Sequence, residues 1–189
     1  MKGFSQKYEY QQAQENAISA AIHVAAIVRV ISFNPAKMTV NVQPVTQLNG
    51  STGSQILGVP VAGTRGGGFI FRPVFRTGDI GVVLYLDHDM DEAMARGGDA
   101  VPNTERRHSD NDAVFLGGVI SGGWSSSGLP EGIVLATEDG GIHLAVTSSG
   151  IKVKGTITVD GDVIADGISL KSHLHADVTT GGDVTGTPI

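Results

Sequence analysis

Residues 140–161 read GGIHLAVTSSGIKVKGTITVDG, and this stretch decides the fold of the C-terminal third of the chain. Aliphatic residues alternate with polar ones, and turns containing glycine separate the short alternating runs. Such a pattern is typical of short strands that are apolar on one face only. The same pattern begins near residue 131 and continues to about residue 170, so the whole segment 131–170 is predicted to be β-structure.

These one-sided strands predict an assembly. All aromatic residues (6 Phe, 3 Tyr and 1 Trp) lie between Phe4 and Trp124, so the remainder has none for a core. About 59 residues of aliphatic strands cannot bury enough apolar surface alone. Identical strands from neighbouring chains are the simplest cover, which predicts a homotrimer wound into an intertwined β-helix, a triangular prism. A flexible tail is the weaker alternative, and the sequence does not distinguish a monomeric β-solenoid from the trimer.

Upstream of this region the sequence predicts three further parts. Residues 122–130 read GGWSSSGLP, a composition typical of a linker. Residues 23–121 predict five or six strands and one helical turn, an order that favours a small barrel of the OB type. The run at 80–86 is apolar on both faces and is predicted to be a central strand. Residues 1–22 predict a helix whose thin apolar stripe either docks on another component or packs on its own barrel. The fold class is therefore all-β with an N-terminal helix.

The composition excludes several classes of protein. A formal net charge of −6 does not fit a nucleic-acid-coating role, and no nucleic-acid partner is expected. The acidic C-terminal segment would be repelled by an anionic bilayer. The chain has no cysteine, which excludes disulfides and thiolate sites. Neither a signal peptide nor an apolar stretch of spanning length is present, so synthesis in the cytoplasm is expected.

His173 and His175, in the motif Ser172-His173-Leu174-His175, are the candidate metal ligands. Residues two apart in a strand project to the same side, so both imidazoles can approach one ion. Three chains would supply six nitrogens, and a saturated octahedral site is structural rather than catalytic. A His-x-His pair also arises by chance in exposed strands, so this prediction depends on the trimer.

Other clusters predict no chemistry. Residues 87–92 (DHDMDE) resemble a calcium loop, but Glu92 and Gly98 occupy the positions that need Gly and the bidentate acid, respectively. The acids are interpreted as favourable residues at a helix N-terminus. Residues 106–108 (RRH) are interpreted as a solvated or interface cluster, and His143 as an exposed residue of a strand. The sequence has none of the common hydrolase, nucleotide-binding or zinc-protease motifs, and no enzyme activity is expected.

Short motifs occur along the chain in a fixed order. They are FRTGDIG at 75–81, MDE at 90–92, RGGD at 96–99, RRHS at 106–109, NDAVF at 111–115, SHLH at 172–175, GG at 181–182 and TGTP at 185–188. Together they resemble phage baseplate central spike proteins, the short membrane-piercing spikes without a lysozyme domain. The motifs up to residue 115 are similar to the N-terminal domain of that family, and the last three are similar to its apex.

The resemblance implies a fold and a site. It implies an OB-fold domain at 23–121, a trimeric β-helical spike at 131–170 and a metal-capped apex at 171–189. It further implies one iron ion per trimer, octahedral and structural, held by His173 and His175 of three chains.

The resemblance also implies a function. The chain would be the central spike of a contractile phage tail or a related injection machine, and would puncture the host outer membrane mechanically. It would be made in the host cytoplasm and lie in the virion at the tip of the tail baseplate. Its partners would be tail hub or baseplate proteins and the host outer membrane.

Two other functions are compatible with parts of the sequence. A trimeric receptor-binding tail fibre protein could use the OB barrel to bind sugar. Such a protein is expected to expose aromatic residues near its tip, and none follows Trp124. A metalloenzyme with an open histidine site is the second alternative, and it would need a vacant coordination position on the metal.

Overall fold

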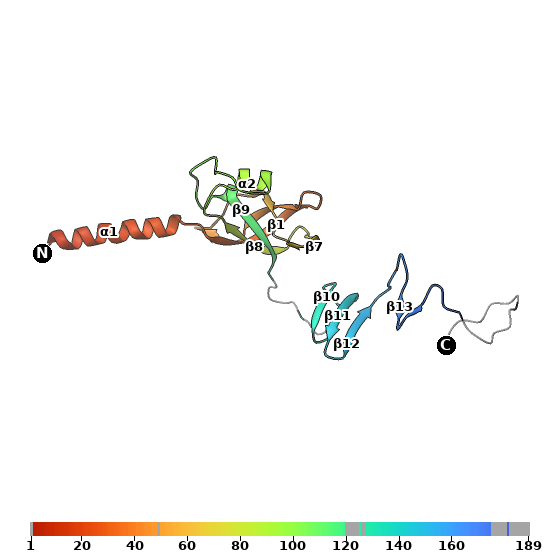
Figure 1. Cartoon of the computed structure of the whole chain (residues 1–189). Coiled ribbons are helices and arrows are strands. Elements are labelled where there is room, and N and C mark those ends of the chain that lie inside the picture. Colours follow the sequence, from red (N-terminus) through yellow and green to blue (C-terminus); the bar gives the residue numbers. More distant parts are fainter. Residues whose placement is uncertain (1, 49, 120–124, 126–127, 175–180, 182–189) are drawn as a thin grey trace. The chain divides into compact units, whose positions relative to one another are not determined.

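The computed structural model describes residues 2–48, 50–119, 125, 128–174 and 181 (Figure 1). The chain forms two compact units, Met1–Trp124 and Ser125–Ile189. The described part is mostly β-structure, as the sequence predicts. Most of the predicted linker, and His175 with most of the predicted apex, lie outside the described residues.

The first unit begins with one long helix. α1 spans Lys2–Ala21 and is rich in glutamine, glutamate and alanine, and these three residue types favour helix formation. The side chains described along it, at 7–18, are all exposed. No described residue of α1 therefore belongs to the buried core of the unit, which draws its residues from 26–115.

Five strands of the first unit form one antiparallel sheet of order β5-β2-β1-β8-β9. They are β1 (Ala25–Asn34), β2 (Thr39–Pro44), β5 (Ile56–Pro60), β8 (Ile80–Tyr85) and β9 (Ala113–Gly118). The sheet curls until its ends meet, where Val61 forms a parallel bridge with Phe115 and the Ala62 N–H donates to the Phe115 carbonyl at 2.7 Å. Register shifts in three of the strand pairs favour this curvature.

The interior of the curled sheet is filled by alternate residues of its strands. The fully buried apolar side chains of this unit are aliphatic except for the Phe115 ring, and Val28, Val30 and Val83 are among them. The predicted central position of the 80–86 run is confirmed, because β8 lies between β1 and β9. Gly81 on β8 is required by packing, since any side chain there would collide with the Phe115 ring. The period-two pattern thus sets both the strands and the core.

Two small hairpins extend from this sheet. β3 (Gln47–Leu48) pairs with β4 (Ser51–Thr52), and β6 (Thr64–Gly66) pairs with β7 (Phe69–Phe71). The second hairpin turns at Gly67 and Gly68, whose φ values of 57° and 83° favour glycine. The alternation of the sequence predicts a strand at 68–74, which includes β7, but predicts none at its partner β6.

A short helix and a single 3₁₀ turn lie between β8 and β9. α2 (Asp91–Arg96) confirms the predicted helical turn, and it ends at Gly97 in the left-handed conformation. The 3₁₀ turn, η1 (Asp110–Asp112), is capped by the Ser109 hydroxyl, which accepts from the Asn111 N–H at 3.2 Å. The connection between these two elements carries Arg106, which organises the site described below.

The second unit is a three-stranded antiparallel meander followed by a small hairpin. The meander consists of β10 (Ile133–Ala136), β11 (His143–Thr147) and β12 (Gly150–Lys154). The hairpin pairs β13 (Ile164–Ala165) with β14 (Ile168–Ser169). Residues 156–159, predicted as a strand, form none in the single chain, because a strand needs a neighbour to accept its ladder hydrogen bonds and none pairs with this segment.

Long apolar helices are absent from the part of the chain that the structure describes. No helix there has the length and hydropathy needed to cross a bilayer.

Candidate functional sites

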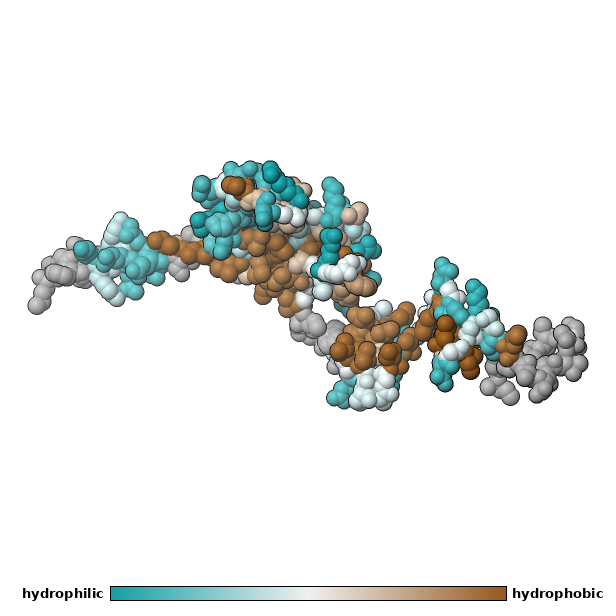
Figure 2. Space-filling model, in the orientation of Figure 1, coloured by the Kyte–Doolittle hydropathy of each residue, from teal (hydrophilic) through white to brown (hydrophobic). Residues whose placement is uncertain are grey.

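The first candidate site is one face of the β10–β12 sheet. The register aligns Ile133 with Val146 and Ile151, and it aligns Leu135 with Leu144 and Val153. All six side chains therefore project from the same face, here called the aliphatic face. Their exposed fractions run from 43% to 77%, and Figure 2 shows apolar residues gathered on one side of these strands. The predicted one-sided strands are confirmed, and nothing within the described part of the second unit covers this face.

The opposite face of the meander carries smaller and polar residues. Ala145 is fully buried there, and Lys152 pairs with it in register. His143, predicted to be exposed, is half-buried instead, with its Nδ1 3.2 Å from the Gly140 carbonyl oxygen. The prediction failed because the turn that precedes β11 folds back over this face, and the strand alternation alone does not reveal that contact.

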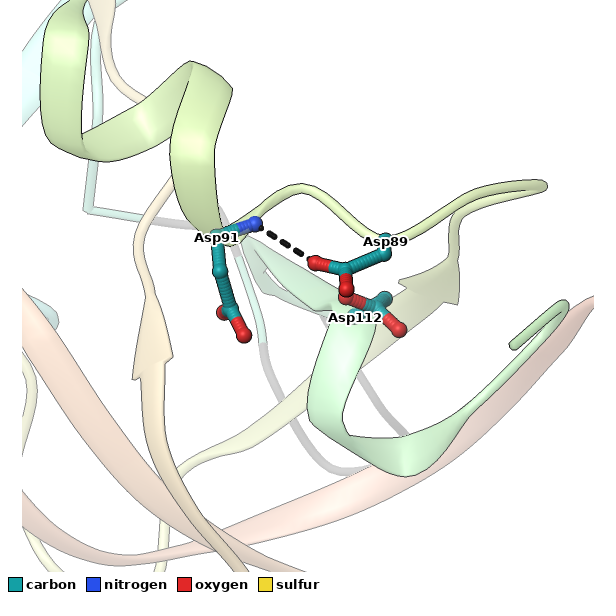
Figure 3. Close-up of side chains that lie close together, drawn as sticks. All are labelled: Asp89, Asp91 and Asp112. Atoms are coloured by element: carbon teal, nitrogen blue, oxygen red, sulfur yellow. Dashed lines mark hydrogen bonds between the residues drawn. The ribbon is translucent and has the colours of Figure 1, made fainter. Parts of the chain in front are cut away.

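The second candidate site is a group of three carboxylates beside α2 (Figure 3). The side chains of Asp89 and Asp112 are fully buried, whereas Asp91 lies at the surface. One carboxylate oxygen from each residue lies within 4.8 Å of the others. Oxygen ligands at this spacing are the kind that bind hard cations such as Ca²⁺ or Mg²⁺.

Arg106 provides the positive charge that these carboxylates require. Its Nη2 lies 3.0 Å from Asp89 Oδ1 and 2.9 Å from Asp91 Oδ2, and its Nε donates to Asp112 Oδ2 at 2.8 Å. A guanidinium is always charged and presents its donors in a rigid fork, so one arginine can pair with several carboxylates at once. We therefore assign this group a structural role, in which Arg106 fixes the connection between α2 and β9 to the strands.

Further hydrogen bonds complete the network and explain why its buried acids are ionised. The Asp91 N–H donates to Asp89 Oδ1 at 3.0 Å and the Thr104 hydroxyl donates to Asp89 Oδ2 at 2.7 Å, and these bonds hold the pKa of Asp89 below its ordinary value. The Arg106 hydrogen bonds have the same effect on the pKa of Asp112. Both buried acids therefore stay ionised at neutral pH.

This network corrects one interpretation of the sequence and refines another. Arg106 is not part of a solvated cluster, since its side chain is only 25% exposed and is paired with three acids. Asp91 and Glu92 do lie in the first turn of α2, as predicted. The sequence does not predict that Asp89 is buried, because the order of its charged residues does not show which acid faces inward.

The third candidate site is the predicted metal pair. His173 is described and exposed, and its Nδ1 lies 2.9 Å from the Ser169 carbonyl oxygen and 3.2 Å from that of Leu170. Because a carbonyl oxygen can only accept, the neutral ring carries its proton on Nδ1 and its lone pair on Nε2. Metal-ligating histidines commonly donate one ring N–H to a carbonyl in this way, so His173 fits a role as a ligand. His175 lies outside the described residues, and the metal pair stays a prediction.

Comparison with known families bears on the first unit. Residues 27–118 match the family model described as the phage protein Gp138 N-terminal domain. The matched span covers the sheet from the third residue of β1 to the end of β9, and it includes the whole Arg106 network. The match supports a phage structural protein of the tail or baseplate type, which fits a location in the virion. No curated protein matches the chain.

The Arg106 network predicts how the stability of the first unit depends on pH. The pKa of each buried acid is lowered from 3.8, so its stabilisation is complete above that value and is lost as pH falls through the folded-state pKa. Replacing Arg106 with Ala leaves buried carboxylates uncompensated and should lower the melting temperature at pH 7 by about 10 °C. The difference between the two proteins should narrow below about pH 4, because protonation removes the charge that Arg106 neutralises.

The neighbouring arginine provides a matched control for this measurement. Arg107 is exposed and makes no ion pair among the described residues, so Arg107→Ala removes the same charge without touching the network. Thermal melts followed by circular dichroism from pH 7 to pH 2 compare the three proteins. Equal melting temperatures for Arg106→Ala and Arg107→Ala at pH 7 would contradict the structural role assigned to the network.

The metal pair leads to a second prediction. Replacing His173 and His175 with Ala should remove a metal that is otherwise present at about one ion per three chains. Because ligation needs neutral imidazoles and protons compete with the metal for them, the metal should also be lost on acidification. The measurement is elemental analysis of the purified protein beside the double variant. A ratio near one ion per chain, or an exchangeable water on the metal, would indicate an open site and favour the metalloenzyme.

Proposed function

We propose that the chain is the central spike at the tip of a contractile phage tail or a related injection machine. It acts mechanically and without enzymatic activity by puncturing the host outer membrane. The observation that carries the proposal is the uncovered aliphatic face of β10–β12, joined in one chain to a unit that matches a phage protein family. A spike needs a stiff shaft, and such a face can provide one when chains associate.

The aliphatic face supports a homotrimer. Burying a half-exposed aliphatic side chain contributes about 1 kcal/mol, so covering six of them stabilises the assembly by several kcal/mol per chain. Three copies wound around one axis place these faces inside a triangular prism and leave Lys152 and Lys154 on the outside. In that arrangement the segment 156–159, in which threonine alternates with isoleucine and valine, also gains neighbouring strands with which it can pair. No chain can then slide out alone, so the prism transmits an axial force.

The first unit is proposed to attach the spike to the tail. Its strand order, with β1 between β2 and β8 and the segment after β5 meeting β9, fits the five-stranded barrel of the OB type. Three such barrels form a base wide enough to contact a tail hub or baseplate protein. At the other end, His173 and His175 of three chains are proposed to hold one structural iron ion, which keeps the three C-termini together at the tip.

The function is tested by separating adsorption from puncture. Particles that carry the chain without residues 131–189 should still adsorb to host cells, because the shaft takes no part in recognising a receptor. They should fail to release a periplasmic marker enzyme, because the outer membrane stays intact. Loss of adsorption instead would favour the receptor-binding fibre, and normal release of the enzyme would contradict a puncturing role.

Trimer formation is tested on the aliphatic face itself. Replacing Leu144 with Asp places a charge where the prism is expected to be dry, and it should abolish the trimer at micromolar concentration because burying an unpaired charge is very costly. The matched control is Lys152→Asp on the opposite face of the adjacent strand, which should remain trimeric. Sedimentation equilibrium measures the mass of each protein. A trimeric Leu144→Asp variant, or a monomeric parent protein, would contradict the proposed assembly.

A further inference from the structure

The β13–β14 hairpin, which leads directly to His173, is closed at its open end by a carboxylate. Asp162 Oδ1 accepts from the Val163 N–H at 2.8 Å and from the Lys171 N–H at 3.0 Å. Between them, the Leu170 N–H donates to the Val163 carbonyl at 2.8 Å. Each strand of this hairpin has only two residues, so its own ladder is short. Asp162 adds to that ladder by joining the chain before β13 to the chain after β14.

Ser169, the last residue of β14, connects this carboxylate to the turn that follows the hairpin. Its hydroxyl donates to the Asp162 carboxylate, and this bond is the largest cause of the lowered pKa of Asp162. The same hydroxyl oxygen accepts from the Ser172 N–H at 2.9 Å and from the Ser172 hydroxyl at 2.8 Å. A chain of hydrogen bonds therefore runs from Asp162 through Ser169 to Ser172, the residue before His173.

The turn at 169–172 orients the imidazole ring of His173. The His173 N–H donates to the Ser169 carbonyl at 3.1 Å. The ring Nδ1 lies 2.9 Å from the same oxygen and 3.2 Å from the Leu170 carbonyl oxygen. Packing contributes little to the orientation, because His173 is exposed and the next residue, Leu174, is 94% exposed. The two carbonyls therefore set the tautomer of the ring, and they belong to the segment that Asp162 and Ser169 hold in place.

We propose that Asp162 and Ser169 are positioning residues for the metal at the tip, because they hold the turn at 169–172 in the conformation that offers Nε2 of His173 to the ion. This inference rests on the metal site proposed above and adds to it two residues outside the His-x-His pair, neither of which contacts the ion. Partners that orient a metal-ligating histidine are part of such sites, and their loss typically lowers metal affinity about 10- to 100-fold.

The competing explanation is that these two residues only close the hairpin. The Asp162 bonds to Val163 and Lys171 serve that purpose. The Ser169 bonds to Ser172 lie beyond the hairpin and act on the turn that carries the histidine. Replacing Ser169 with Ala therefore separates the two roles, because it removes the bonds to the turn and leaves the Asp162 bonds to the backbone available.

The first measurement is the iron affinity of the full-length protein. Each protein is loaded with ferrous iron without oxygen at neutral pH, and a competing chelator is titrated into it. Asp162→Ala and Ser169→Ala should each weaken the affinity about 10- to 100-fold. Ser169→Thr keeps the hydroxyl and should bind iron nearly as the parent protein does.

A second turn of the same unit provides the matched control. Asp139, between β10 and β11, likewise accepts from its own turn, from the Gly141 N–H at 2.9 Å and from the Thr137 hydroxyl at 2.6 Å. Asp139→Ala therefore removes a carboxylate of the same kind from a turn that does not carry the histidine. It should keep the iron affinity of the parent protein.

The tautomer of His173 is a second readout, which the stability of the hairpin alone does not change. It is measured by nitrogen NMR on metal-free protein with ¹⁵N-labelled histidine, at a pH above the histidine range so that the ring is neutral. The His173 signals are assigned by their absence from His173→Gln. The parent protein should carry the ring proton on Nδ1, whereas Ser169→Ala should show a mixture of both tautomers. Ser169→Thr should restore the parent's tautomer.

Sedimentation and thermal melts before each titration show which variants are folded trimers. If Asp162→Ala does not fold, Asp162→Asn replaces it, because the amide oxygen can still accept from both backbone N–H groups but its NH₂ group cannot accept from the Ser169 hydroxyl. This variant should lose less affinity than Ser169→Ala does. A loss of iron as complete as in the double histidine variant would instead indicate that Asp162 is a direct ligand, which overturns the inference.

The remaining outcomes separate this inference from the proposed function. Folded trimers of Ser169→Ala with the parent's affinity and tautomer overturn the positioning role and leave the metal site and the spike intact. Weaker binding with an unchanged tautomer, or an equal loss in Asp139→Ala, also overturns it, because the effect would then come from elsewhere. A parent protein that binds no iron overturns both the metal site and this inference.

Discussion

The second unit depends on one constraint, which is that six aliphatic side chains on one face of β10–β12 are exposed to water. A three-stranded sheet needs a cover for at least one face, and this segment has no aromatic residue to supply a core. The single chain therefore holds the secondary structure of a folded domain without its hydrophobic stabilisation. In the homotrimer that we propose, association would supply the missing burial, and folding and association of this unit would then be one process.

The first unit buries the apolar face of its sheet within the single chain. Its sheet curls until the segment after β5 meets β9, and alternate valines with the Phe115 ring fill the interior. The Arg106 network then fixes the connection between α2 and β9 to the strands. The three motifs MDE, RRHS and NDAVF, which carry much of the family resemblance, contribute Asp91, Arg106 and Asp112 to this network. These motifs thus supply residues with a structural role in the first unit.

Much of the fold could be predicted because period-two alternation reports directly on burial. It identified β1, β2, β8, β9 and the one-sided strands of the meander. It missed β6, because a three-residue strand beside a glycine turn is too short to show a period. It predicted a strand at 156–159, where the alternation is present but a single chain offers no partner. For the candidate sites, the metal role predicted for His173 and His175 stays a prediction. The sequence misread Arg106, because which loop residue turns inward depends on contacts between distant segments.

The meander also bears on how such a shaft can change over evolution. Each strand contacts only its neighbours, and glycine turns such as the one at Gly150 join strands of similar length and composition. Adding or removing one strand with its turn leaves the other contacts as they were, as in repeat proteins. In the spike that we propose, the length of the shaft could thus vary in small steps without redesign of the base or the tip, so selection could adjust it to envelopes of different thickness.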